Sequence, residues 1–537
     1  MKKKLVFIFK FFKILTKRER FFLIGGTILA VFLLILSIQT IVQKLLKTEP
    51  AVGGVWTEGL YEPVDTLNPF LANNSTEKSL INLIFGSLVR PNGQGGYELE
   101  LAKKILILDN GLTYQIELHH DLKWSNGEKI TSADVVYSFN LDQNYGSAEL
   151  KNILKGATIK PLDRSTLIIT LPVKNNYFIQ NLSFLKIVPM KIWSGVAVTN
   201  WLQDEKNLTR VSSGPYVLTN RTKIRANVEK LTFETNKNYF NQPMIPRLEF
   251  YSYPDIQQAF DALKIREIKA LAGVPPDLIP ALLNNRSKIE KIFLPRVIGV
   301  FFNQTAINTT NLNFNSISSQ INREEIKNKT FDGYADIADN IFSRSFEKLY
   351  HLTQVSTNSS SSSNSNQNLA PESTSSSSTI ELIVPRNYFF QKIGDYLKNK
   401  FGWKINVQSV DKIQLETIPN KNYQALLFGI NYNLYPELTP FFNPISPYDL
   451  TNSDNPKIQK VIQNLEIAPL NQSDYSQNLS KIEELIKQNE PSIFLTNPDY
   501  LYLVPKNLGG YNAFYLNQPE ERFDKIEEWH LETRIKW

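Results

Sequence analysis

Leu122–Phe139 reads LKWSNGEKITSADVVYSF and joins a tight turn to the start of a helix. Asn126-Gly127 suits a hairpin turn that needs positive φ. Thr131 or Ser132 can cap the helix that follows, with Asp134 at its positively polarised N-terminus. The stretch therefore predicts a strand end, a turn and a capped helix in close succession.

Strand and helix patterns alternate outward from this stretch. Thr113–Leu118 alternates polar and apolar residues, which predicts a strand, and residues 159–171 read as two strands around a turn. Residues 379–385, 388–400 and 403–410 repeat a strand, helix and strand rhythm. In a chain of 537 residues, too long for one core, this rhythm indicates a second α/β lobe.

Residues 358–378 are nearly all Ser, Asn, Thr and Gln. Such a segment cannot bury enough apolar surface to offset the entropy lost on ordering. We therefore expect a disordered insertion over about 356–378, inside the second lobe.

The N-terminal region has the pattern of a membrane anchor. Residues 21–42 hold no charge, and as a helix they would span roughly 33 Å at ~1.5 Å per residue. The basic residues before them place 1–20 in the cytoplasm and the body outside, with 43–54 as a stalk. A cleaved signal peptide is the alternative, but the apolar run is longer than its usual ~7–15 residues.

The charge of the chain is concentrated at its start. The formal net charge is +7, and residues 1–20 alone carry eight basic residues against Glu19. The rest is neutral overall, whereas a nucleic-acid binder should show a basic face on its folded part. The absence of cysteine excludes disulfides, thiolate metal sites and a lipidated cysteine anchor.

Motifs for enzymatic or metal chemistry are weak. His119 and His120 are neighbours on an expected strand, so they would point to opposite faces and could not ligate one metal together. Ser75 to Lys78 and Ser183 to Lys186 match the short S-x-x-K pattern, but the S-D-N and K-T-G companions do not occur. No phosphate-binding loop is present either. The sequence therefore predicts no enzyme.

The ordered series of segments resembles the family-5 extracellular solute-binding proteins, which include peptide- and nickel-binding receptors of ABC importers. Residues 122–139 look like the family's long "lkWsdGepltaeDVvysf" signature. Shorter pieces are similar to other family elements in the expected order: Leu67-Asn68-Pro69, Ile84–Arg90, Ser213–Tyr216, Asn236–Phe240, Ile321–Ile326 and Glu490–Phe494.

The resemblance implies an α/β, two-lobe, periplasmic-binding-protein-like fold of class II, of the family-5 type with an extra subdomain. The first lobe is expected over 55–295, with the subdomain inserted at about 75–200. The second lobe is expected over 296–489, and 490–537 would return to the first lobe. The lobes of such proteins close on a ligand by hinge motion, and no cofactor is implied.

Seven residues are candidates for the ligand cleft, although each also has a reading as strand packing or turn chemistry: Trp56, Glu58, Asn303, Gly429, Asn431, Tyr432 and Asn433. The last four lie in Tyr423–Pro436, which resembles the family's cleft strand. Ile430 replaces the usual Trp there, and Asn431, Asn433 and Tyr435 stand where acids are expected. Because a buried ammonium needs a compensating charge, this strand suits neutral polar groups better than a free peptide N-terminus.

Three functional hypotheses follow. The first is an anchored extracytoplasmic receptor that delivers a peptide or peptide-sized solute to the permease and ATPase subunits of an ABC importer. The second is an envelope scaffold or sensor that keeps the binding-protein fold without transport. The third, a serine hydrolase, would require Ser75 or Ser183 to be labelled by an acylating probe.

Overall fold

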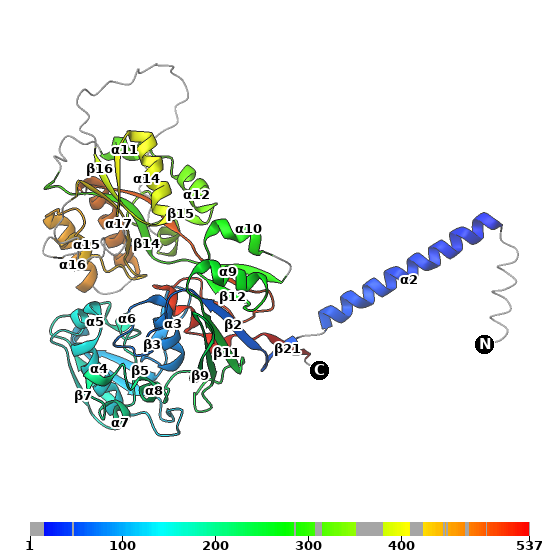
Figure 1. Ribbon diagram of the computed structural model, residues 1–537, viewed down its shortest axis with the longest axis horizontal. Helices are drawn as coiled ribbons and strands as arrows, with labels where there is room; N and C mark the ends of the chain where they lie inside the picture. Colours follow the sequence, from blue (N-terminus) through cyan, green and yellow to red (C-terminus); the bar gives the residue numbers. More distant parts are fainter. Residues whose placement is uncertain are drawn as a thin grey trace, which may run out of the picture.

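A computed structural model describes residues 16–45, 48–283, 286–306, 314–350, 380–408, 423–443, 446, 449–467, 472–489 and 491–535. Side chains at positions 17, 20, 23, 35, 38–45, 48, 148–149, 472–474 and 535 lie outside this description. The Ser-rich insertion expected at 356–378 also lies outside the described residues. The described chain forms two lobes, one of which carries a subdomain (Figure 1).

The first lobe is built on a seven-stranded mixed sheet. In spatial order its strands are β13 (Ser287–Ile292), β20 (Tyr500–Pro505), β12 (Ala270–Ala272), β2 (Val55–Leu60), β11 (Arg247–Ser252), β10 (Val228–Thr235) and β9 (Tyr216–Arg225). Strand β2 runs parallel to both of its neighbours, and it is buried along most of its length. That position explains the nearly continuous burial of a strand that the sequence places at the start of the body.

The second lobe has a six-stranded sheet. Its strands, again in spatial order, are β15 (Ala335–Ile337), β19 (Ser492–Pro498), β14 (Arg296–Phe302), β18 (Ala425–Asn431), β16 (Glu381–Pro385) and β17 (Lys404–Gln408). Strands β16 and β17 are parallel and joined through helix α14 (Tyr388–Phe401), so the strand, helix and strand unit expected there is confirmed. The two-lobe α/β architecture is confirmed with it.

The subdomain holds a four-stranded antiparallel sheet with the order β5 (Ala102–Leu108), β6 (Thr113–Leu118), β8 (Thr166–Thr170) and β7 (Thr158–Pro161). A small ribbon of β3 (Val89–Pro91) and β4 (Tyr97–Leu99) leads into it. The expected strand at Thr113–Leu118 and the expected pair within 159–171 are confirmed. His119 and His120 follow β6 rather than lying on it, so the prediction that they share a strand is wrong.

The capped helix predicted from the signature stretch is present. Helix α4 (Ser132–Tyr145) begins after Thr131, whose backbone N–H donates to Asp134 Oδ2 at 2.9 Å. The other oxygen of Asp134 accepts from the backbone N–H of Met190 at 3.0 Å. Gly127 has a φ of 90°, as the turn requires. The signature therefore fixes a junction in which one carboxylate holds the start of α4 and the first residue of α7, Met190.

The remaining helices cover the sheets. In the first lobe and the subdomain they are α3 (Ser75–Ile84), α5 (Ala148–Ile153), α6 (Phe178–Asn181), α7 (Met190–Trp193), α8 (Glu205–Leu208), α9 (Ile256–Lys264) and α10 (Ile279–Leu282). In the second lobe they are α11 (Phe314–Gln320), α12 (Arg323–Phe331), α13 (Arg344–Leu349), α15 (Thr439–Phe442), α16 (Pro456–Ile467) and α17 (Gln472–Asn489). The sequence also predicts helices over 455–465 and 475–488, and these are confirmed as α16 and α17.

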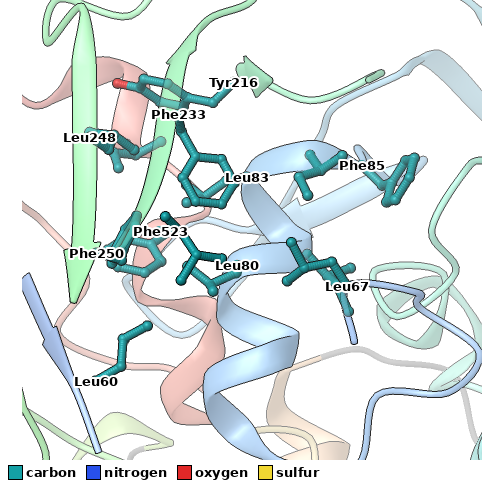
Figure 2. Packing of buried hydrophobic residues seen from close by; sticks show 14 of the residues in the cluster. Leu60, Leu67, Leu80, Leu83, Phe85, Tyr216, Phe233, Leu248, Phe250 and Phe523 are labelled. Atoms are coloured by element: carbon teal, nitrogen blue, oxygen red, sulfur yellow. The ribbon is translucent and has the colours of Figure 1, made fainter. Parts of the chain in front are cut away.

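Helix α3 belongs to the core of the first lobe, although the sequence placed the start of the subdomain at about residue 75. Figure 2 shows Leu80 and Leu83 of this helix facing Phe233 and Phe250 of the seven-stranded sheet, with Phe523 beside them. All five side chains are buried in one cluster. Helix α3 is therefore held between the sheet and the C-terminal segment.

The chain crosses between the lobes near 293–295 and again near residue 499. Strand β19 pairs with β14 in the second sheet, so the expected return to the first lobe at residue 490 is corrected to β20. Strand β19 is apolar and buried for most of its length, which would suit either sheet. Only its hydrogen-bonded pairing shows that it belongs to the second sheet.

Helix α2 (Lys17–Leu45) stands apart from the lobes (Figure 1), and its described side chains are exposed, including Phe21, Phe22 and Ile28. Across the described part of the chain, no helix is long and apolar enough to cross a membrane. The transmembrane helix expected at 21–42 therefore has no support from this structure. Part of the expected stalk is a strand, β1 (Thr48–Ala51), paired with β21 (Glu532–Ile535).

Candidate ligand-binding site

Trp56 and Glu58 point from β2 into the core of the first lobe. Both side chains are fully buried. Glu58 Oε2 accepts hydrogen bonds from Trp56 Nε1 at 3.0 Å and from the hydroxyl of Tyr502 at 2.6 Å. Glu58 Oε1 forms an ion pair with Arg522 Nη2 at 2.9 Å. These contacts make Glu58 the centre of a closed polar network, so the structure gives it and Trp56 a packing role.

Arg522 extends this network to helix α3. Its Nη1 atom donates to the hydroxyl of Ser79 at 2.7 Å, and its side chain is 3% exposed. Burial acts against the charge of Arg522, but the Glu58 carboxylate outweighs it and raises the pKa of the guanidinium. A buried ion pair with both members hydrogen-bonded in this way fixes how α3, β2 and the C-terminal segment meet.

The candidates in and near β18 do not converge on one point. Asn303 lies just beyond β14 and accepts from the backbone and hydroxyl of Thr305, while Asn431 pairs with Arg296 at the opposite end of that strand. Seven strand residues separate the two ends, which corresponds to roughly 20 Å. Tyr432 is fully buried in the core of the second lobe, where it packs against Phe342 and Phe346.

Asn431 meets the first lobe instead of an open cleft. Its Nδ2 atom donates to the backbone carbonyl of Asn517 at 3.1 Å, and its Oδ1 atom accepts from the Asn433 N–H at 3.3 Å. The Asn517 side chain accepts from the Leu434 N–H at 2.7 Å and donates to the hydroxyl of Tyr97. Asn517 thus connects the end of β18 in the second lobe with the ribbon strand β4.

Aromatic rings reinforce this contact between the lobes. Tyr97 of β4 packs on Tyr435 with ring centroids 6.1 Å apart, and Tyr435 in turn contacts Tyr350 and Tyr475. A second contact lies at Asn176, whose backbone and side chain donate to the carbonyls at the end of α16. The two lobes are therefore in contact on the side where the subdomain faces the second lobe.

The crossings between the lobes are tied to each other. Arg296 Nη2 donates to the carbonyl of Pro498 at 2.8 Å, and Asn497 Nδ2 donates to the carbonyl of Leu294 at 2.9 Å. Burial lowers the pKa of Arg296 to about 10. Because each bond joins one crossing to the other, a hinge motion here has to move both strands together.

A pocket of about 190 Å³ lies beside the contact between Asn431 and Asn517. Its apolar wall includes Phe70, Ile81, Leu150 and Phe184, and Gln518 follows directly after Asn517. Its charged side chains are Lys78, Asp142, Lys186, Glu520, Glu521 and Asp524. Helix α3 and the loop before it, the end of α4, α5, the segment after α6 and the C-terminal segment supply the lining, so the pocket belongs to the first lobe and its subdomain.

The carboxylates of the pocket differ in their hydrogen bonding. Glu521 Oε2 accepts from the Asn517 N–H at 2.8 Å, and Asp524 Oδ1 accepts from Asn82 Nδ2 at 3.1 Å. Glu520 accepts from the hydroxyl of Ser75 at 3.1 Å. Asp142 is 4% exposed, and its Oδ2 atom is buried without a hydrogen-bond partner.

Burial dominates the protonation of this pocket. It raises the pKa of Glu521, together with the nearby Asp524 charge, to about 8. It raises the pKa of Asp524 to about 7 although Lys186 opposes the shift, and it raises the pKa of Asp142 well above its usual range. Perturbed carboxyls grouped in a concave site are typical of functional sites.

None of the seven residues predicted from the sequence lines this pocket. The acidic run at Glu520, Glu521 and Asp524 was the available signal, but such a run is usually a solvated face. Asp142 gave no signal, because its burial depends on packing between the subdomain and α3. Sequence reasoning therefore missed the pocket through the lack of tertiary information.

The S-x-x-K pairs have no nucleophile geometry. The hydroxyl of Ser75 donates to Glu520, and that of Ser183 donates to the carbonyl of Gln180. Lys186 Nζ donates to the hydroxyl of Ser87 at 2.9 Å. An activated serine needs a hydrogen bond to its base, and both hydroxyls are engaged elsewhere. Among the residues that the structure describes, no group of acidic and His side chains could hold a metal ion.

Comparison with known proteins gives a consistent result. The model of the bacterial extracellular solute-binding proteins, family 5 (middle part), matches residues 96–451. The oligopeptide-binding protein AppA of Bacillus subtilis is 20% identical over 515 residues, which cover 90% of this chain and 92% of that protein.

Solved structures share the fold. The structure of AppA in complex with a nonapeptide superposes with a TM-score of 0.68 at 18% identity, over 90% of this chain and all of that one. The ABC transporter substrate-binding protein CtaP of Listeria monocytogenes gives a TM-score of 0.72 at 20% identity, over 90% of this chain and all of that one.

Proposed function

Because the chain belongs to family 5 of the bacterial extracellular solute-binding proteins, we propose that it is a membrane-anchored receptor for a peptide or peptide-sized solute. It delivers this solute to the permease and ATPase subunits of an ABC importer. The observation that carries the proposal is the family match over 96–451, a range that includes the subdomain and strands of both sheets.

The structural relatives support the same role. AppA, named as an oligopeptide-binding protein, is similar along nearly the whole of both chains, and its solved structure contains a nonapeptide. The lobes are in contact at Asn517 and Asn176, and the pocket beside Asn517 supplies a concave surface with charged groups. Hinge closure of two lobes around a ligand is the usual way in which periplasmic binding proteins hold it.

Anchoring is supported by the sequence at the N-terminus. Residues 21–42 carry no charge and follow a strongly basic segment, and the chain has no cysteine that could carry a lipid. The described apolar side chains of α2 are exposed, which is costly in water and favourable in lipid. A tether of this kind raises the effective concentration of the receptor at its permease.

Calorimetry with the detergent-solubilised full chain and a library of short peptides tests the receptor function. Saturable binding of a peptide or peptide-sized solute is expected, together with a rise in melting temperature. Failure of every member of the library to bind would contradict the proposal. Extraction of membranes at alkaline pH tests the anchor, since a spanning helix stays in the pellet and a peripheral protein is released.

An envelope scaffold or sensor is the second candidate. It is favoured by Asn431, which uses its side chain for a contact with the first lobe rather than for an open cleft. The genes beside this one separate the two candidates, because transport needs a permease and an ATPase. A locus without them and a chain that binds no solute would favour the scaffold.

A further inference from the structure

We propose that the pocket beside the segment Gln518–Asp524 receives a positively charged group of the solute, an ammonium or a guanidinium, with Asp142 as its main partner. This inference rests on the proposed receptor function and names the chemical class of ligand that the same protein takes. It places recognition of positive charge in the first lobe and its subdomain, away from β18.

Asp142 has a buried carboxylate oxygen without a hydrogen-bond partner. Its carboxylate lines the pocket, is 4% exposed and has one oxygen without any hydrogen bond. An ionised carboxylate in this state is costly unless a cation or a donor reaches it. It also lies in the last turn of α4, where the negative end of the helix dipole adds to the attraction for a cation. A bound ammonium would supply both the missing hydrogen bond and the opposite charge.

Carboxyl groups outnumber lysines in the lining of the pocket. Four carboxylates line the pocket against two lysines. Lys78 lies 4.0 Å from Glu520, and Lys186 donates to Ser87 while its charge acts on Asp142 and Asp524. With Glu520 matched to Lys78, Lys186 is the remaining lysine of the lining for Asp142, Glu521 and Asp524, and Arg90 also acts on Asp524.

The volume of the pocket limits the group that it can hold. About 190 Å³ is somewhat more than the roughly 150 Å³ of an engineered cavity that binds benzene, and less than the roughly 300 Å³ at which pockets for drug-sized ligands begin. One amino-acid residue of a peptide, or one small amine, fits this space. Phe70, Ile81 and Phe184 offer an apolar wall along which the stem of a lysine or arginine side chain can lie.

Protonation couples to this binding. Burial raises the pKa of Asp142 well above its usual range, which favours the protonated carboxyl while the pocket is empty. A cation favours the ionised carboxylate, and its binding therefore releases a proton to the buffer. A ligand group without charge has no such effect.

The test compares blocked tripeptides by calorimetry on the detergent-solubilised full chain. Ac-Ala-Lys-Ala-NH2 and Ac-Ala-norleucine-Ala-NH2 differ only in the side-chain ammonium, and Ala-norleucine-Ala-NH2 restores a cation at the N-terminus instead. We expect one cationic peptide to bind roughly ten- to hundredfold more tightly than the norleucine peptide, the range of one charge-assisted hydrogen bond. Tighter binding of the lysine peptide would show that the pocket receives a side-chain ammonium, and tighter binding of the peptide with a free N-terminus would show that it receives the N-terminal ammonium.

The variant Asp142→Asn should abolish this preference, and the dependence of the binding enthalpy on buffer ionisation should vanish with it. Glu483→Gln is the matched control, because it removes a buried carboxyl with a raised pKa in the second lobe and should keep the preference. Asp524→Asn, which keeps an acceptor for Asn82, is a second variant if Asp142→Asn does not fold.

The outcomes separate the inference from the function on which it rests. Equal affinity of the charged and neutral peptides, or an unchanged preference in both pocket variants, overturns the inference and leaves the receptor function standing. Absence of binding by all three blocked peptides and by the wider library overturns the receptor function itself. Tight binding of a neutral or acidic solute from that library, without proton release, also overturns the inference alone.

Discussion

Asn431 Nδ2 donates a hydrogen bond to the backbone carbonyl of Asn517 at 3.1 Å, so the strand expected to face a ligand is joined to the opposite lobe. The side chain of Asn517 completes this contact by accepting from the Leu434 N–H at 2.7 Å and donating to Tyr97. One residue of the C-terminal segment therefore connects the end of β18, the ribbon strand β4 and the first residues of the pocket. The contact between the lobes and the lining of the pocket therefore meet in the segment that begins at Asn517.

Replacement of Asn517 should favour an open arrangement of the lobes. In Asn517→Ala the Leu434 N–H loses its acceptor, and a buried donor without a partner costs about 1–3 kcal/mol. We expect a larger radius of gyration by small-angle X-ray scattering with an unchanged circular dichroism spectrum. Asn507→Ala removes an exposed asparagine side chain bonded to Leu531 and should leave the radius unchanged. Equal radii of gyration for wild type and Asn517→Ala would contradict a role of Asn517 in holding the two lobes together.

Glu58 should matter for stability and not for ligand affinity. Glu58→Gln leaves the buried Arg522 without its counter-charge, which typically costs about 3–5 kcal/mol. We expect a lower midpoint in urea unfolding, followed by fluorescence, and peptide affinity within about twofold of wild type. The double variant Glu58→Gln/Arg522→Met should recover much of the midpoint, because no unpaired charge remains. A loss of affinity without a loss of stability would instead place Glu58 in the ligand site.

The buried acids of the pocket make stability depend on pH. The pKa of Glu521 is raised from 4.5 to about 8 and that of Asp524 from 3.8 to about 7, so the folded protein binds more protons than the unfolded chain between these values. Their stabilising contribution is complete below about pH 4 and is lost as the pH rises to about 8, at up to about 1.4 kcal/mol per pH unit for each group.

Glu521→Gln checks this dependence. Its melting temperature should fall less than that of wild type between pH 5 and pH 8, because the amide stays neutral throughout. Burial raises the pKa of Glu483 to about 8, so this residue contributes to the pH dependence of the melting temperature in both proteins. Parallel curves for the two proteins would show that Glu521 does not titrate in this window.

Asp134 should stabilise the start of α4 and the segment around Met190 without affecting the second lobe. Asp134→Ala removes the acceptor for Thr131 at the start of α4 and for Met190 at the start of α7, at about 1–2 kcal/mol for the lost cap alone. Hydrogen exchange should speed up at the first turn of α4 and at residues 188–190, while exchange in the second sheet stays unchanged. Thr131→Ser keeps a capping hydroxyl and serves as the control. Faster exchange throughout the chain would mean that the effect is not local.

Patterns within the sequence were sufficient for the elements. The signature at 122–139 predicted a turn and a capped helix, and the alternation at Thr113–Leu118 predicted a strand, because both depend on contacts between residues close in the chain. The same holds for α14 between β16 and β17. The resemblance to family 5 extended these local elements to a two-lobe fold, which the two sheets and the solved structures with the same fold bear out.

The site required tertiary structure. Glu58 was a candidate for the ligand cleft, but Arg522, which pairs with it, comes 464 residues later in the chain. Asn431 looked like a cleft residue until Asn517 was placed against it. Asp142 could not be identified from the sequence, because its burial depends on packing between the subdomain and α3. Local periodicity and capping chemistry therefore determined the elements from the sequence alone, whereas long-range packing decided which charges are paired, which remain unpaired, and where a ligand can bind.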